Sequence, residues 1–192
     1  MRTPGITALS FMLAALLTLA AAPAPAATPE KFSLSSAQIA PGRKIADEQV
    51  FNAFGCSGKN ISPSLAWKNP PAGTKSFALM VHDPDAPTGS GWWHWVVINI
   101  PASVNALAAN AGDPKSALLP KGAVHGVTDF GSAAYGGPCP PAGSGPHHYH
   151  FRLFALKVAS INVPAGASAA LIGFNVRANA LAVAELTGVY SR

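Results

Sequence analysis

Charged side chains are scarce in this sequence of 192 residues: Asp, Glu, Lys and Arg make up 11% of it, against roughly 25% in an average soluble protein. Only eight residues are acidic, and the formal net charge is +5. The basic residues are scattered, with Arg43-Lys44 as the one adjacent pair. Proteins that bind nucleic acid usually gather such residues on one face or along one helix. The sequence therefore argues against a nucleic-acid partner, while a mild positive excess favours small anionic ligands.

Long apolar runs are absent except near the N-terminus. There Arg2 precedes the apolar stretch 6–22, and Ala24-Pro25-Ala26 offers the small residues that suit a signal-peptide cleavage site. A membrane anchor is the alternative, but three hydroxyl residues interrupt the stretch and spanning a bilayer takes about 20 apolar residues. We expect residues 1–26 to be a cleaved signal peptide, with no stable membrane anchor. Residues 27–192 are then expected to form one domain in the periplasm or outside the cell.

Cysteine is nearly absent as well, which excludes a small scaffold held by many disulfides. The two cysteines, Cys56 and Cys139, lie in segments rich in Gly and Pro. In an exported chain the oxidising surroundings favour a disulfide between them. Two free thiols are the alternative. A zinc site is disfavoured, because neither cysteine has a second ligand residue at the short spacing that such sites use.

What the chain does have is a series of short apolar runs separated by Gly and Pro, which is typical of a β protein with many loops. The run Phe77–Val81 ends just before Asp83-Pro84, and Trp92–Ile100 is closed by Pro101. In the third run, apolar and polar residues alternate from Tyr149 to Leu153, as in a strand with one buried face. These patterns predict three strands.

The C-terminal part has a different composition. Ser168 to Leu186 is rich in Ala and Leu and lacks Pro, with Ser168 placed as an N-cap and Gly188 as a C-terminal stop. We therefore predict a helix over this stretch. The expected fold is mainly β: a two-sheet β-sandwich with long loops and a C-terminal α-helix.

Polar residues suited to ligand binding gather beside the predicted strand ends. They occur in three segments: Asp83-Pro84-Asp85-Ala86-Pro87, Trp93-His94-Trp95, and Tyr135–Pro141 running on to His147-His148-Tyr149. Each segment alone has a simpler explanation: Asp and Pro favour turns, Trp commonly fills a core, and a single His is usually an interior hydrogen-bonded residue. Together they predict one pocket built from three distant parts of the chain.

At these residues the chain resembles the phosphatidylethanolamine-binding protein family, in its bacterial Raf-kinase-inhibitor-like branch. The resemblance spans nearly the whole chain after the signal segment and rests on several motifs in the same order. The motifs are Cys56–Pro63 with Leu65-Ala66-Trp67, Asp83–Pro87, Trp92–Trp95, Tyr135–Pro141, His147–Phe151 and Gly188-Val189-Tyr190.

The resemblance implies a two-sheet fold with Greek-key character and a pocket for phosphate or phosphorylated head groups. The residues that it assigns to ligand binding are Asp83, Asp85, His94, Gly137, Cys139, Pro141, His147 and Tyr149. Within the loop Gly137–Pro141, the backbone amide of Cys139 falls where the family holds its anion, and neither neighbouring proline has an N–H to offer. The loop after Asp85 lacks the tyrosine of eukaryotic relatives, which puts their ligand selectivity in doubt here.

The chemistry of these residues suits an anion. His94 and His147 can donate N–H groups, Asp83 and Asp85 can orient them, and the Tyr149 hydroxyl adds a donor. The pair Gly136-Gly137 would allow the backbone to approach the ligand closely.

Other functions are less favoured by the sequence. The imidazoles of His147, His148 and His150 alternate across a strand, so they cannot share a metal ion without a bend. No Ser lies in a G-x-S-x-G motif, so we expect no catalytic residue, no cofactor and no enzyme. A hydrolase that uses His94 or His147 as a base is one alternative, and an inhibitor of a protease or kinase-like partner is another.

Overall fold

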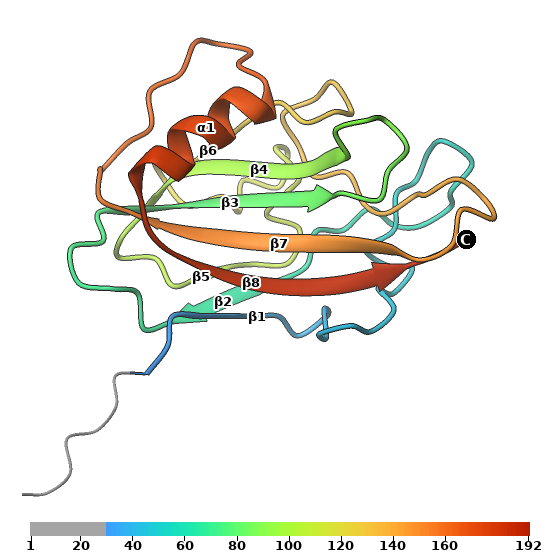
Figure 1. Cartoon of the computed structure of the whole chain (residues 1–192), viewed down its shortest axis with the longest axis horizontal. Helices are drawn as coiled ribbons and strands as arrows, with labels where there is room; N and C mark the ends of the chain where they lie inside the picture. The colour runs from blue at the N-terminus through green and yellow to red at the C-terminus, as the bar shows by residue number, and fades with distance from the viewer. Residues whose placement is uncertain (1–29) are drawn as a thin grey trace, which may run out of the picture.

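The computed structural model describes residues 30–192, so the expected signal peptide lies outside the described residues. Two sheets make up the fold: one of three strands in the order β1-β2-β5 and one of five in the order β6-β4-β3-β7-β8, all paired antiparallel (Figure 1). The elements are β1 (Ser33–Ser35), β2 (Leu65–Lys68), β3 (Ser76–Asp83), β4 (Trp92–Pro101), β5 (Ala106–Leu107), β6 (Val124–His125), β7 (His147–Leu156), α1 (Ala169–Asn179) and β8 (Ala180–Tyr190). The mainly β, two-sheet prediction is confirmed. Within residues 30–192 no helix has the length and apolar character needed to cross a bilayer.

The core lies between the sheets and follows from side-chain alternation along the strands. On β7, Tyr149, Phe151 and Leu153 are each at most 1% exposed, whereas His148 faces outward. The three predicted strands correspond to β3, β4 and β7, each extended by one to several residues. Trp95 is fully buried in the same cluster. This buried face fixes the register of the central strands, because a shift by one residue would turn it toward solvent.

The outer face of the five-stranded sheet is covered by α1 (Figure 1). Ile172 and Val176 of the helix belong to a second apolar cluster with sheet residues that include Met80 and Phe154. The helix begins as predicted: Ser168 has an extended backbone, and its hydroxyl accepts a hydrogen bond from the Leu171 N–H.

The predicted end of the helix is wrong. The helix stops at Asn179, and Ala180–Tyr190 forms β8, which pairs with β7 along its whole length. Ala184 and Leu186 point into the core while their neighbours face outward, a strand pattern that the Ala- and Leu-rich composition concealed. Gly188 is a strand residue and not a helix stop. A Cβ atom there would lie 2.8 Å from Ile45 Cγ1.

The strand order places the three polar segments together. β3 lies in the middle of its sheet, hydrogen-bonded to β4 on one side and to β7 on the other. Because both pairings are antiparallel, the end of β3 at Asp83 lies beside the start of β4, near His94, and the start of β7 at His147. One edge of the sheet therefore collects side chains from positions far apart in the sequence.

Candidate ligand-binding site

A cavity of about 210 Å³ opens at this edge of the sheet. Six of the eight residues that the sequence assigned to the ligand line it, and Asp85 and Gly137 do not. Its lining residues are Phe54, Asp83, Ala86, Pro87, Thr88, Trp92, His94, Phe130, Cys139, Pro140, Pro141, His147 and Tyr149.

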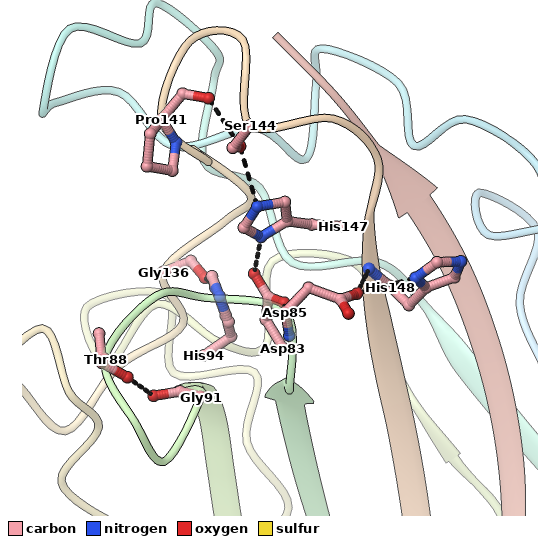
Figure 2. A network of polar contacts seen from close by, with 10 residues as sticks. All are labelled: Asp83, Asp85, Thr88, Gly91, His94, Gly136, Pro141, Ser144, His147 and His148. Atoms are coloured by element: carbon pink, nitrogen blue, oxygen red, sulfur yellow. Dashed lines mark hydrogen bonds and ion pairs between the residues drawn. The ribbon is translucent and has the colours of Figure 1, made fainter.

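The centre of the site is a buried pair of Asp83 and His147. The distance from His147 Nδ1 to Asp83 Oδ2 is 2.7 Å, and each residue is only 2% exposed (Figure 2). An ionised carboxylate only accepts hydrogen bonds, so Nδ1 carries the proton and donates it. The second ring nitrogen, Nε2, lies 3.0 Å from the hydroxyl oxygen of Ser144. Asp83 thus fixes the orientation of the His147 ring, as expected.

His94 is held by the backbone instead of by a carboxylate. Its Nδ1 lies 2.7 Å from the Gly136 carbonyl oxygen and donates to it. Burial lowers the pKa of His94 to about 4, so the ring is neutral at pH 7. In that form its single N–H is already used, and Nε2 is a hydrogen-bond acceptor. Donation from His94 to an anion therefore requires protonation of the ring, which a bound anion itself favours.

The hydroxyl of Tyr149 is a buried donor without a partner. Within residues 30–192 it makes no hydrogen bond, although the residue is only 1% exposed. Burial, and next the nearby Asp83 carboxylate, raise the pKa of Tyr149, so the phenol keeps its proton. The Cys139 N–H also meets no acceptor in the described part of the chain. The cavity wall thus contains two donors that a ligand can satisfy.

Asp85 serves the neighbouring strand and not the cavity. Its Oδ2 accepts hydrogen bonds from the backbone N–H and the ring Nδ1 of His148, both at 2.8 Å. Burial alone would raise the pKa of Asp85, but the bonds from His148 outweigh that effect and lower it. We expected Asp85 to orient the pocket histidines, but its carboxylate bonds to His148, which does not line the cavity. Instead it ties the start of the β3–β4 loop to β7.

The glycines of the Tyr135–Pro141 segment allow other segments of the chain to pack closely against its backbone. A Cβ atom on Gly136 would collide with the Phe130 ring, and one on Gly137 with the backbone carbonyl of Gln49. The close backbone approach expected at these positions is therefore an approach to other segments of the chain, not to the ligand.

The predicted disulfide is confirmed: Cys56 and Cys139 are bonded, with their Cα atoms 6.0 Å apart. Cys139 lines the cavity, and the bond brings the chain around Phe54 to the cavity entrance. Phe54 is 68% exposed and packs near Phe130, with 6.0 Å between ring centroids. Sequence reasoning did not find this aromatic wall. The signal was available, because Phe54 is two residues from a cysteine whose partner lies in the predicted pocket.

The histidines of β7 turn to separate carboxylates. His147 pairs with Asp83, His148 with Asp85, and His150 with Glu185 at 2.7 Å. No group of three or more His, Cys, Asp or Glu side chains in residues 30–192 is arranged to hold a metal ion.

Comparison with known proteins agrees with the two-sheet fold. The family model described as phosphatidylethanolamine-binding protein matches residues 35–191. This chain belongs to that family. The family and the fold inferred from the motifs are thereby confirmed, whereas the ligand is a separate question.

Two relatives from Escherichia coli K12 show how far the likeness in this family extends. The UPF0098 protein YbcL is 53% identical over 159 residues, which cover 83% of this chain and 87% of YbcL. YbhB is 48% identical over 158 residues, covering 82% of this chain and 99% of YbhB. The crystal structure of YbcL matches with a TM-score of 0.83 at 52% identity, over 85% of this chain and 99% of that one.

Proposed function

We propose that this member of the phosphatidylethanolamine-binding protein family is exported and binds a small anion, phosphate or a phosphorylated head group, in the cavity beside Asp83 and His147. The observation that carries the proposal is the buried Tyr149 hydroxyl, which makes no hydrogen bond within residues 30–192. Unsatisfied buried donors cost free energy unless a ligand or water accepts from them. An anionic oxygen is the strongest acceptor for this purpose.

The charge of His147 can adjust to the ligand. The Ser144 hydroxyl lies 2.8 Å from the Pro141 carbonyl oxygen and can donate to it. Its oxygen is then free to accept a hydrogen bond from a protonated Nε2 of His147, and a ring protonated on both nitrogens is a cation held against Asp83. An imidazolium at the cavity wall offsets the repulsion between the Asp83 carboxylate and an incoming anion.

Export is supported by two independent features. The disulfide Cys56–Cys139 suits an oxidising compartment, and the first 26 residues have the composition of a signal peptide. We infer a periplasmic or extracellular location after cleavage.

Calorimetric titration of the exported form with phosphate, phosphoethanolamine and ethanolamine tests the anion proposal. The two phosphates should bind and ethanolamine should not.

Tyr149→Phe removes only the hydroxyl and should raise Kd for phosphate by roughly tenfold, because about one charge-assisted hydrogen bond is lost. His94→Ala should weaken binding as well.

His148→Ala is the matched control, since this residue is on the same strand with its side chain outward. It should leave phosphate binding unchanged. Equal binding of ethanolamine, or equal effects of Tyr149→Phe and His148→Ala, would contradict the proposal. If no anion binds at millimolar concentration, a protein partner becomes the leading explanation for the cavity.

A further inference from the structure

Two residues that line the cavity, Asp83 and His147, form a continuous hydrogen-bonded series with Ser144. Asp83 Oδ2 lies 2.7 Å from His147 Nδ1, and His147 Nε2 lies 3.0 Å from Ser144 Oγ (Figure 2). Asp83 and His147 are buried, whereas Ser144 is exposed in the loop that enters β7. The order carboxylate, imidazole, hydroxyl is the arrangement by which unrelated hydrolases activate a serine, and it is recognised by geometry and not by position in the sequence.

We propose that Ser144 is a nucleophile toward small uncharged carboxylic esters, with His147 as its general base and Asp83 as the group that orients the base. This activity goes beyond anion binding and does not depend on it. The two uses of the cavity require different forms of the same residue: a cationic His147 favours the anion, and a neutral His147 favours attack by Ser144.

The proton positions needed for attack are available without movement of heavy atoms. Asp83 holds a proton on His147 Nδ1, which leaves the lone pair of Nε2 directed at Ser144 in the neutral ring. The Ser144 hydroxyl has two acceptors within reach, the Pro141 carbonyl at 2.8 Å and His147 Nε2 at 3.0 Å. A rotation about the C–O bond moves its proton from the first to the second.

The backbone presents Ser144 on a tight turn. Gly143 and Gly145 on either side both have positive φ, 78° and 87°, and Ser144 N–H bonds to the Pro141 carbonyl. Two glycines in this conformation allow a sharp reversal that projects the serine side chain outward. The sequence lacks the G-x-S-x-G motif, in which a sharp turn exposes the serine hydroxyl. The turn Gly143-Ser144-Gly145, which lies just before β7, also leaves its serine exposed.

The rest of the cavity suits an acyl group. Phe54, Trp92 and Phe130 supply an apolar wall, and the Trp92 and Phe130 rings meet edge to face at 5.5 Å. A volume of about 210 Å³ admits a short acyl chain. Tyr149 and Cys139 line this cavity, and in the proposed reaction their O–H and N–H are the donors that we assign to the oxyanion of a tetrahedral intermediate.

The reaction balances with water as the only co-reactant. Ser144 Oγ forms a bond to the ester carbonyl carbon while its proton passes to His147 Nε2. The carbon–oxygen bond to the alcohol then breaks, and the alcohol leaves with that proton, so that an acyl-Ser144 ester remains. A water molecule, deprotonated by His147, attacks this ester and releases the carboxylic acid, and the proton returns to Ser144 Oγ. Asp83 stays ionised throughout and stabilises the imidazolium.

A fluorophosphonate probe tests the nucleophile directly, because it leaves a stable adduct on an activated serine. The exported form should gain one adduct by intact mass, and peptide mapping should place it on Ser144.

Ser144→Ala should abolish labelling, and Asp83→Asn should slow it by roughly 10²–10⁴ fold by disturbing the base. Ser132→Ala is the matched control, an exposed serine earlier in the same β6–β7 connection, and should label like the parent.

Hydrolysis of p-nitrophenyl acetate gives the second readout, with a rate that Ser144→Ala reduces to the background. Circular dichroism establishes that Asp83→Asn is folded. The proposal fails if the parent protein takes up no adduct, if the adduct maps to another residue, or if Asp83→Asn and the parent label at the same rate. A protein that binds phosphate in the calorimeter and takes no adduct retains the anion site and loses the nucleophile, so the two outcomes are separable.

Discussion

Two histidines at the same cavity are fixed in different electrostatic settings. His147 faces the carboxylate of Asp83, which stabilises a positive ring. His94 faces a backbone carbonyl and the edges of two aromatic rings, with centroids 5.0 Å from Tyr149 and 5.3 Å from Phe130. Its neutral state is therefore part of the folded structure, and protonation of His94 opposes folding.

The stability of the protein should consequently fall in mild acid. Because the pKa of His94 is lowered from 6.5 to about 4 by folding, the unfolded state binds more protons between these values. The free energy of unfolding should drop by roughly 3 kcal/mol as the pH falls through this window. Urea unfolding at several pH values measures the effect. His94→Gln should flatten the dependence, whereas His148→Gln, on the exposed side, should keep most of it. Parallel curves for His94→Gln and the parent protein would assign the dependence to other groups.

At the scale of elements, β8 shows where local composition misleads. Ala and Leu favour a helix, and a helix does begin at Ala169. Ten backbone pairings with β7 outweigh this preference after Asn179, and the inward positions of β8 then complete the core between the sheets. The start of the helix was predictable because its N-cap is local. Its end depended on a partner strand more than 20 residues away, which the composition of 168–186 does not contain.

Gly188 distinguishes the predicted helix from the observed strand β8. In the strand, its missing side chain leaves room for Ile45 and Ile39, and its φ is not positive. Gly188→Ala should therefore lower the free energy of unfolding by roughly 1–3 kcal/mol through overpacking. Val183→Ala, on the outer face of the same strand, should cost less than about 1 kcal/mol. Chemical denaturation of both variants gives the comparison, and a neutral Gly188→Ala would mean that the isoleucines shift freely.

At the scale of the whole molecule, the disulfide connects two walls of the cavity that lie 83 residues apart in sequence. On one side it holds the loop that carries Phe54, and on the other the segment Cys139–Pro141. Arg192 reinforces the first loop, with its Nη1 atom 2.9 Å from the Gly55 carbonyl oxygen. The entrance of the cavity is thus fixed by a covalent bond and not by the sheet alone.

Loss of this bond should affect both stability and binding. In the chain-entropy description, closing a loop of this length contributes about 4 kcal/mol. The double variant Cys56→Ser, Cys139→Ser should lose up to this amount in urea unfolding and should bind phosphate more weakly, since one cavity wall is released. Addition of a reductant should destabilise the parent protein and leave the double variant unaffected. An equal response of both proteins to the reductant would show that the effect does not arise at this disulfide.

Much of the site could be predicted because its residues are chemically unusual for strand ends. Asp83 follows an apolar run, His94 lies within one and His147 precedes one, and the family resemblance assigned all three to the pocket. The partners of these residues were not. That Asp85 turns to His148, and that Ser144 reaches His147, depends on loop conformations that only the assembled sheet determines. The aromatic wall was hidden for the same reason, since Phe54 reaches the cavity through the disulfide.

The central place of β3 also has a consequence for how the protein matures. Asp83 and His147 are 64 residues apart, and their contact requires β3 to be paired with β7, which emerges late from the ribosome or translocon. Long-range pairings of this kind form slowly. The cavity therefore cannot form before β7 has been made and has paired with β3. Under the proposed function, a chain interrupted before β7 should capture no anion.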